Sequence, residues 1–328
     1  MNNTNGRLEK ERRFYEKMKE KLQGLPSILN EYCNSMRANR KSYTTVGVYI
    51  NNVLHFARFM AEGEIDEEFY KHITPSDVEN YMISLEIRET DDGIKRTGDD
   101  ILQARWSSLN TFFDWCLKRG YIDTNPMKVV GRPKNNTEHK VTYLTKVEIN
   151  KLLRAIDSNP NQVLGKRDKT IISLALATAL RISALVNMNV GDVDLDNGVI
   201  KVIEKRQKVR DINIGENTVN MLKEWIEFRN DIYQDIDSPA LFLSKNYERI
   251  SVFGVNNMLE KYCAWAGIKR ITFHKLRASS ACALARTGVP VKAIAKQLGH
   301  SQISTTMRYL DVFNEDLEKT KGVLDNLF

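Results

Sequence analysis

Apolar residues recur at helical spacing through the first 120 residues of the chain. Between residues 42 and 61 they mark one helix face, which begins after Ser42 and includes Val46, Ile50 and Val53. Apolar periodicity predicts helices at about residues 27–38, 42–61, 75–87 and 100–118, and the charged segment 7–21 reads as a mostly exposed helix. No strand pattern is evident before residue 130, so an all-helical N-terminal domain is expected.

Capping residues support these helix boundaries. Thr74, Pro75 and Asp77 supply an N-cap, a proline at the first helical position and an acid in the first turn. Gly120 is expected to end the last of these helices, and residues 89–99 read as a polar loop.

The pattern after residue 140 predicts helices together with a small antiparallel sheet. Thr145 and Glu148 form a capping box, and Asn197-Gly198 is a turn signal between apolar alternations at 193–203 and 209–214. Helices are predicted at about residues 146–157, 167–187, 216–230, 252–266, 274–287, 290–298 and 303–325.

Residues 129–143 read as an interdomain linker, because they are polar, contain Gly131 and Pro133 and show no hydrophobic period. The expected organisation is an N-terminal basic helical extension (1–24), a helical domain (25–128), the linker (129–143) and a mixed α/β domain (144–328). The fold class is therefore mainly α, with one small antiparallel sheet.

Composition changes this picture little. The chain has 328 residues, of which 42% are hydrophobic and 28% charged, as in globular proteins. No apolar run reaches the length of a membrane span and no apolar signal core opens the chain, so we expect a soluble cytoplasmic protein without a membrane partner. The four cysteines are scattered without a CxxC pair, which suggests neither a disulfide framework nor a zinc site.

The distribution of charge points to a polyanionic partner. The net charge is +7, and residues 261–310 hold nine basic side chains and no acid, although Glu260 and Asp311 bracket them. Solvated helix faces usually mix both signs, so this window favours a surface that faces phosphates. The candidate DNA contacts are Lys208, Arg210, Lys269, Arg270, Lys275, Arg286 and Lys296.

Chemistry-bearing residues lie in ordered segments of the second domain. These segments are Ala179-Leu-Arg181, the basic stretch from Lys205 to Arg210, His274-Lys-Leu-Arg277 and Leu298-Gly-His300, with Tyr309 nine residues after His300. Together they resemble the catalytic half of the tyrosine recombinases, the family of phage integrases and Xer-type recombinases. The resemblance implies a helical, SAM-like core-binding domain followed by a catalytic domain, with Arg181, Lys205, His274, Arg277, His300 and Tyr309 in the catalytic positions.

These residue types suit cleavage of a phosphodiester through a covalent intermediate. Tyr309 is the candidate nucleophile, although a phenol of pKa ~10 needs surroundings that accept its proton or stabilise the phenolate. The guanidinium groups of Arg181 and Arg277 can hold the non-bridging phosphate oxygens in the transition state, so no metal or other cofactor is expected.

The remaining catalytic positions move or hold protons. Lys205 is expected to protonate the leaving 5′ oxygen, with Lys208 as the runner-up because the hairpin register is uncertain from sequence. His274 is the candidate general base, and His300 is expected to donate a hydrogen bond to the phosphate.

Each residue taken singly also has an ordinary structural interpretation. An arginine at a helix end is usually an exposed ion-pair partner, and Tyr309 could be a packing residue, with Tyr262 as the competing nucleophile. Asp192, Asp194 and Asp196 raise the possibility of a two-metal nuclease, but they alternate at strand spacing without a His or Glu neighbour.

The sequence departs from the family pattern at two positions. Ala184 stands where the family commonly has an acid three residues after the first arginine, which leaves the positioning of the site in question. Asp311 stands where many Xer-type members have a histidine, which favours an integrase of a mobile element.

The resemblance implies a site-specific recombinase that acts on double-stranded DNA recombination sites through a 3′-phosphotyrosyl intermediate. It also implies a homo-tetramer in the synaptic complex, a C-terminal helix that docks on a neighbouring protomer, and a possible accessory directionality factor. The alternatives are strand transfer like that of a type IB topoisomerase or a telomere resolvase, and a catalytically idle DNA-binding protein.

Overall fold

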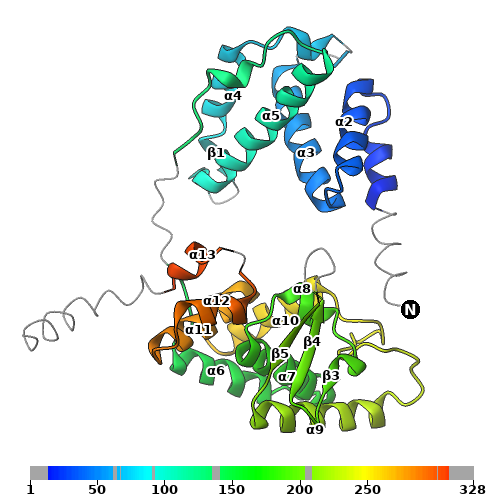
Figure 1. The fold of residues 1–328 in the computed structure, drawn as a ribbon, viewed down its shortest axis with the longest axis vertical. Helices are drawn as coiled ribbons and strands as arrows, with labels where there is room; N and C mark the ends of the chain where they lie inside the picture. Colours follow the sequence, from blue (N-terminus) through cyan, green and yellow to red (C-terminus); the bar gives the residue numbers. More distant parts are fainter. Residues whose placement is uncertain are drawn as a thin grey trace, which may run out of the picture. The chain divides into compact units, whose positions relative to one another are not determined.

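The chain divides into two compact units, Met1–Glu138 and His139–Phe328, and each is described by itself (Figure 1). The structure is a computed structural model that describes residues 14–61, 65–66, 68–90, 93–134, 141–203, 209–300 and 302–309, without the side chains of 88–90. The division falls inside the polar segment 129–143 that reads as a linker. None of the described helices is both long enough and apolar enough to cross a membrane.

The N-terminal unit is built from helices around an aromatic core. Its elements are α2 (Ser27–Ala38), α3 (Tyr43–Met60), η1 (Phe69–Lys71), α4 (Pro75–Ser84), β1 (Ile87–Thr90), β2 (Gly93–Arg96), α5 (Asp99–Arg119) and η2 (Pro126–Lys128). Phe112 of α5 meets Tyr32 of α2 edge-on, and Phe113 meets Phe56 of α3 in the same way. Residues 14–21 are also helical, and Met18 belongs to the same core.

The predicted caps of this unit are confirmed. The Ser42 hydroxyl accepts a hydrogen bond from the Thr45 backbone N–H at 3.2 Å. Thr74 and Asp77 form a reciprocal capping box at the start of α4, and Gly120 ends α5 with φ of +75°. These residues act on the nearest helix turn, which is why sequence alone could place them.

A β-hairpin in this unit corrects the expectation of an all-helical domain. β1 and β2 pair antiparallel from Ile87↔Arg96 to Thr90↔Gly93, where a polar loop was expected, and α4 ends at Ser84 rather than near residue 87. Ile94 is 75% exposed, and the Thr97 N–H donates to the Glu86 carbonyl across the base of the hairpin. The described side chains of both strands are exposed, so no apolar alternation marks the strands in the sequence.

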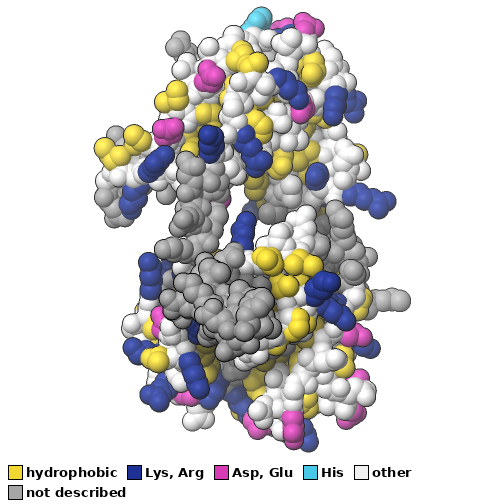
Figure 2. All heavy atoms as spheres, turned by 60° about the vertical axis from the view of Figure 1, so that its left-hand side comes forward, with side chains coloured by type: hydrophobic (Ala, Val, Ile, Leu, Met, Phe, Trp, Pro, Cys, Tyr) yellow, Lys and Arg dark blue, Asp and Glu magenta, His cyan; other side chains and the backbone are white. Residues whose placement is uncertain are grey.

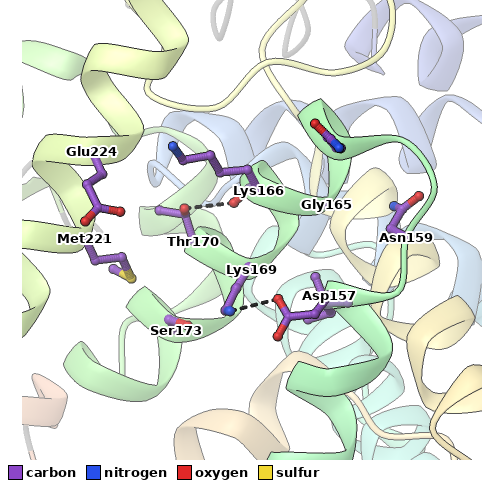
Figure 3. A pocket seen from close by; sticks show the side chains of 11 residues that line it. Asp157, Asn159, Gly165, Lys166, Lys169, Thr170, Ser173, Met221 and Glu224 are labelled. Carbon is purple, nitrogen blue, oxygen red and sulfur yellow. Dashed lines mark hydrogen bonds and ion pairs between the residues drawn. The ribbon is translucent and has the colours of Figure 1, made fainter.

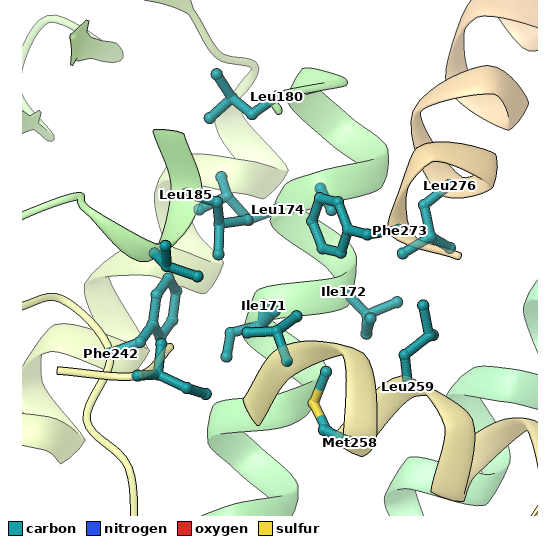
Figure 4. Packing of buried hydrophobic residues seen from close by; sticks show 14 of the residues in the cluster. Ile171, Ile172, Leu174, Leu180, Leu185, Phe242, Met258, Leu259, Phe273 and Leu276 are labelled. Carbon is teal, nitrogen blue, oxygen red and sulfur yellow. The ribbon is translucent and has the colours of Figure 1, made fainter. Parts of the chain in front are cut away.

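The C-terminal unit surrounds α7 with helices and a small sheet. Its helices are α6 (Lys146–Asp157), α7 (Gln162–Thr178), α8 (Ile182–Val186), α9 (Glu216–Ile232), α10 (Val252–Trp265), α11 (Phe273–Arg286), α12 (Val291–Leu298) and α13 (Ser304–Met307), with the 3-10 turn η3 (Val190–Asp192). Figure 4 shows Ile171 and Ile172 of α7 packed among Phe242, Leu259 and side chains of α11. This core supports helix α11 and the helix ends and loops that contain the candidate catalytic residues.

The sheet is antiparallel, as predicted, with strand order β3-β4-β5. Its strands are β3 (Val193–Asp194), β4 (Val199–Ile203) and β5 (Val209–Asn213). Val199 pairs with Asn213 and Ile203 pairs with Val209, so Lys205 and Lys208 fall between the two strands in sequence, outside the described residues. Gly198 has φ of +61°, as the Asn-Gly turn signal requires.

The helix predicted at 167–187 is instead two helices with a corner between them. α7 ends at Thr178, Ala179 adopts φ of +52°, and α8 starts at Ile182. No glycine or proline marks this break; the Ala179 carbonyl accepts a hydrogen bond from Arg277, which is distant in sequence. The last predicted helix, 303–325, is described only as α13, and residues 310–328 lie outside the described residues.

Candidate active site

Arg181 stands on the corner between α7 and α8. Ala179 is the left-handed C-cap of α7, and Leu180 is buried in the core shown in Figure 4. Arg181 follows as the extended N-cap of α8 and is half-buried. Its Nη2 donates to the Gly299 carbonyl at 2.9 Å. The break in the helix therefore directs the Arg181 side chain toward the segment that contains His300.

Arg277 connects the same two segments from α11. It is 2% exposed, and the preceding Leu276 is fully buried in the core. Its Nη1 donates to the Ala179 carbonyl at 2.7 Å, and its Nη2 donates to the Leu298 carbonyl. Both carbonyls belong to the last turn or cap of a helix, where the helix dipole places partial negative charge. Backbone groups thus help to hold a buried cation in a stretch of sequence without Asp or Glu.

His300 follows the turn that these arginines hold. Gly299 ends α12 with φ of +63°, and the His300 N–H donates to the Ala295 carbonyl at 2.9 Å. The His300 Nδ1 lies 2.8 Å from the hydroxyl oxygen of Thr306. Its ring lies nearly parallel to the Tyr309 ring, with centroids 6.3 Å apart and an interplanar angle of 18°.

Tyr309 is buried in a small apolar cluster. It is 4% exposed, and its neighbours come from the α7 corner, α11 and α12: Ala179, Ala278, Ala281, Cys282, Ile294 and Leu298. Burial raises the pKa of the Tyr309 phenol, and the positive charge of Arg277 partly opposes this shift. The phenol is therefore protonated at neutral pH and shielded from solvent in this conformation.

The two histidines of the site are kept neutral at pH 7. Burial, followed by the charges of Arg277, Arg181 and His274, lowers the pKa of His300 to about 4. Partial desolvation and the same two arginines also lower the pKa of His274, whose side chain is nearer to solvent at the start of α11. A bound phosphate would counter these positive charges and weaken the part of each shift that they cause.

The structure thus brings together Arg181, His274, Arg277, His300 and Tyr309. Lys205 and Lys208 cannot be placed, since both lie outside the described residues. Ala184 is half-buried and packs against the core, so the side chain in the family's acid position is apolar and fills space.

Tyr262, the competing nucleophile, has a structural role. Its side chain is fully buried, its hydroxyl donates to Asp168 at 2.8 Å, and it accepts from Asn159 at 2.6 Å. Asp168 also accepts from the Arg167 guanidinium at 2.6 Å. This buried network links α7 to α10 and leaves the Tyr262 hydroxyl without access to DNA.

Two of the three alternating aspartates, Asp192 and Asp194, stabilise turns in the chain. Asp192 accepts from the Asn189 N–H at 2.8 Å, and Asp194 accepts from the backbone and side chain of Asn197 at 3.0 and 2.9 Å. Among the described residues, no three His, Cys, Asp or Glu side chains are grouped so that they could hold a metal ion.

The candidate DNA contacts differ in their surroundings. Lys269, Arg270, Arg286 and Lys296 are exposed, and Lys275 is half-exposed. Arg270 pairs with Glu260 at 3.0 Å, and Arg286 donates to the Tyr143 hydroxyl at 2.8 Å. Arg210 is half-buried and donates to the carbonyls of Lys296 and Gln297, so it joins β5 to the end of α12. Figure 2 shows Lys and Arg side chains on the visible face of each unit, with acidic side chains among them.

A separate pocket of about 400 Å³ lies between α6, α7 and α9 (Figure 3). Lys169 at its wall pairs with Asp157 at 2.8 Å, and Glu224 lies opposite. None of the candidate catalytic residues lines this pocket. It is therefore not the place where a phosphodiester would meet Tyr309.

Thr306 is a site residue that the sequence reasoning did not single out. It is a fully buried polar residue, three positions before Tyr309 and six after His300. A threonine between two catalytic candidates carries no distinctive signal by its type. Its importance comes from the contact with His300 Nδ1, which the fold creates.

Comparison with known proteins agrees with this geometry. Residues 142–316 match the model of the phage integrase family. The tyrosine recombinase XerC of Caldanaerobacter subterraneus subsp. tengcongensis is 31% identical over 309 residues, which cover 90% of this chain and 85% of that protein. The tyrosine recombinase XerC of Salmonella typhi is 33% identical over 221 residues, which cover 66% of this chain and 70% of that protein.

Solved structures share the fold. A XerH site-specific recombinase bound to a palindromic difH substrate has a TM-score of 0.71 at 19% identity, covering 90% of this chain and 84% of that one. The Tn1549 transposon integrase in complex with a circular intermediate DNA has a TM-score of 0.68 at 20% identity, covering 89% of this chain and 99% of that one.

The electrostatics of the site predict an unusual titration of His300. In the DNA-free protein its ring should titrate with a midpoint of about 4, as followed by NMR of the histidine ring protons. Replacing Arg181→Gln should raise this midpoint, because one of the cations that disfavour imidazolium is removed. Arg286→Gln is the matched control and should leave it unchanged, since Arg286 is engaged with Tyr143. A midpoint near the ordinary 6.5 would contradict the described environment.

Proposed function

Because this chain belongs to the phage integrase family of tyrosine recombinases and is a site-specific DNA recombinase, we propose that Tyr309 forms the covalent 3′-phosphotyrosyl intermediate. The observation that carries the proposal is the convergence of Arg181, Arg277 and His300 on Tyr309, with His274 as an electrostatic neighbour of His300. Three separate parts of the sequence contribute to this group of side chains. The arrangement provides both a nucleophile and a binding site for a phosphate.

The two arginines supply the phosphate site. Arg181 and Arg277 both bind the backbone around the 298–300 turn, and both act electrostatically on His300 and Tyr309. A planar guanidinium can hold two oxygens of a phosphate, and the charge that develops on these oxygens in the transition state strengthens the interaction. This is the stabilisation that lets the reaction proceed without a metal in our proposal.

In the cleavage step the Tyr309 oxygen bonds to phosphorus and the bond from phosphorus to the 5′ oxygen breaks. The phenol loses its proton, for which neutral His274 is the proposed acceptor. The leaving 5′ oxygen gains a proton from Lys205. Rejoining reverses the step: the 5′ hydroxyl of the partner strand attacks the phosphotyrosine and releases the phenol.

Tyr309 must become accessible before it can react. At 4% exposure it packs against alanine side chains, Cys282 and the end of α12. We propose that DNA binding moves the Tyr309 side chain out of this cluster and thereby exposes the nucleophile. Burial before binding would protect the cell from unprogrammed DNA cleavage.

DNA contacts beyond the active site are proposed for both units. The N-terminal unit is proposed to take the role of the SAM-like core-binding domain. The exposed Lys269, Arg270, Arg286 and Lys296 and the half-exposed Lys275 are proposed to contact phosphates. Lys208 remains in this set and is the runner-up for the general acid. Arg210 is proposed mainly to support the end of α12, because its guanidinium donates to backbone carbonyls there.

The assembly follows from the reaction. Exchange of two duplexes needs four cleavages, so we propose a homo-tetramer in the synaptic complex, with an accessory factor setting direction.

The C-terminal segment 311–328 is proposed to dock on a neighbouring protomer, since its apolar positions approximate one helical stripe. We also propose a cytoplasmic location, because the proposed substrate is DNA. Topoisomerase-like or telomere-resolving strand transfer is not favoured, because the matched relatives are recombinases and integrases.

Tyr309→Phe should abolish the covalent protein–DNA adduct on a nicked suicide substrate that carries the recombination site, while half-site binding persists. Only the attacking hydroxyl is lost, and wild-type adduct formation should survive EDTA. Denaturing gels measure the adduct, and gel shifts measure binding.

Tyr262→Phe is the matched control and should still form adduct. Removal of the Tyr262 hydroxyl affects stability, because the Asp168 carboxylate loses a hydrogen-bond donor. It should lower the free energy of unfolding in urea by about 1–3 kcal/mol. Adduct formation by Tyr309→Phe, or its loss in a folded Tyr262→Phe, would assign the nucleophile elsewhere.

Lys205→Ala should slow cleavage of ordinary DNA by about 10²- to 10⁴-fold, the usual contribution of a general acid. Cleavage should recover when sulfur replaces the bridging 5′ oxygen, because a thiolate leaves without being protonated. Single-turnover rates on both substrates test this. Equal impairment on both would assign Lys205 to phosphate binding, and rescue of Lys208→Ala alone would move the general acid to Lys208.

Deleting residues 314–328 should leave half-site binding nearly intact and abolish cooperative binding to the full site. The apolar stripe would then lack its partner surface on the neighbouring protomer. Gel-shift titrations on half and full sites measure the difference. Undiminished cooperativity would mean that this segment packs on its own protomer.

A further inference from the structure

Thr306 lies in the short helix α13 (Ser304–Met307), between His300 and Tyr309. It is fully buried, whereas its neighbours Thr305 and Met307 are exposed. A buried hydroxyl requires a hydrogen-bond partner, and the Thr306 Oγ1 lies 2.8 Å from His300 Nδ1. The polar group of Thr306 is therefore directed at a candidate catalytic side chain.

The backbone of Thr306 is fixed as well. Its N–H donates to the Ile303 carbonyl at 2.8 Å, and its carbonyl accepts from the Tyr309 N–H at 3.0 Å. One residue thus contacts the histidine through its side chain and the nucleophile's backbone through its carbonyl. A shift of Thr306 would move both groups.

We propose that Thr306 is a positioning residue of the recombinase, whose hydroxyl donates to His300 Nδ1 and so keeps the proton on Nε2 for the scissile phosphate. This inference rests on the proposed function, in which His300 donates a hydrogen bond to the scissile phosphate. A neutral imidazole carries one N–H, and the hydrogen bond to one ring nitrogen decides which nitrogen carries it. The contact also holds the ring in the plane nearly parallel to Tyr309.

The opposite polarity has a different consequence. If Nδ1 carried the proton and donated to Thr306, the Nε2 would be an acceptor and could not hydrogen-bond to a non-bridging phosphate oxygen. A purely packing role for Thr306 has a third consequence, because its methyl group would then matter more than its hydroxyl. These three roles can be separated by substitution and by tautomer measurement.

The substitutions split the side chain into its two parts. Thr306→Val keeps the shape and removes the hydroxyl, whereas Thr306→Ser keeps the hydroxyl and removes the methyl group. Thr305→Val is the matched control, because it makes the same change at the exposed neighbour in α13. His300→Gln, alone and combined with Thr306→Val, tests whether Thr306 acts through His300.

Single-turnover adduct formation by the full-length protein on a nicked suicide substrate is the kinetic readout. Thr306→Val should slow it about tenfold, the effect of one lost hydrogen bond, and Thr306→Ser and Thr305→Val should stay within about twofold of wild type. In the His300→Gln background, Thr306→Val should add no further loss. Half-site binding should be unchanged in Thr306→Val, Thr306→Ser and Thr305→Val.

The tautomer is read independently in the DNA-free protein by ¹⁵N NMR of labelled histidine. The wild-type His300 should show a protonated Nε2 and a hydrogen-bonded, unprotonated Nδ1, and Thr306→Val should shift the Nδ1 resonance. Wild-type protein that forms no adduct would refute the proposed function, and the NMR result would still decide the role of Thr306.

Three results would overturn the inference. They are a protonated Nδ1 in the wild type, a Thr306→Ser variant as slow as Thr306→Val, and an additive loss in the double variant. The first reverses the polarity of the contact, the second makes Thr306 a packing residue, and the third shows that it does not act through His300.

Discussion

The hydrogen bonds that Arg277 and Arg181 donate to backbone carbonyls hold the site together. Arg277 joins the Ala179 carbonyl to the Leu298 carbonyl, and Arg181 binds the adjacent Gly299 carbonyl. The acceptor carbonyls belong to left-handed C-caps or to the residue just before one, where helix ends leave carbonyls without intrahelical donors. The carbonyls at the ends of two helices thus accept hydrogen bonds from two arginines, and the same contacts set the position of His300.

Electrostatics of the site follow from this construction. Carbonyl dipoles help to hold both guanidinium groups, of which that of Arg277 lies in the acid-free segment 261–310, and their positive charge still acts on the neighbouring side chains. It contributes to the low pKa of His300 and partly offsets the effect of burial on Tyr309. A phosphate is the ligand that such a field favours, and its arrival would relax each of these shifts. Binding and activation of the catalytic groups are therefore physically linked.

The N-terminal unit illustrates how far local patterns reach. Its caps at Ser42 and Thr74 were predicted because each acts within one helix turn. The hairpin at Ile87–Thr90 and Gly93–Arg96 was missed because the described side chains on its strands are exposed, so no apolar period marks it. A strand whose two faces are both exposed is held by backbone hydrogen bonds, and these leave no hydrophobic pattern in the sequence.

The sequence by itself determined the element types of most of the chain, the small antiparallel sheet and the order of the candidate catalytic residue types, because periodicity, caps and motif spacing are local. Tertiary structure alone decided the break at Ala179, the burial of Tyr309, the contact between Thr306 and His300 and the structural role of Tyr262. The break shows the reason most clearly. The Ala179 carbonyl meets a donor 98 residues away, and no local pattern around residue 179 encodes that partner.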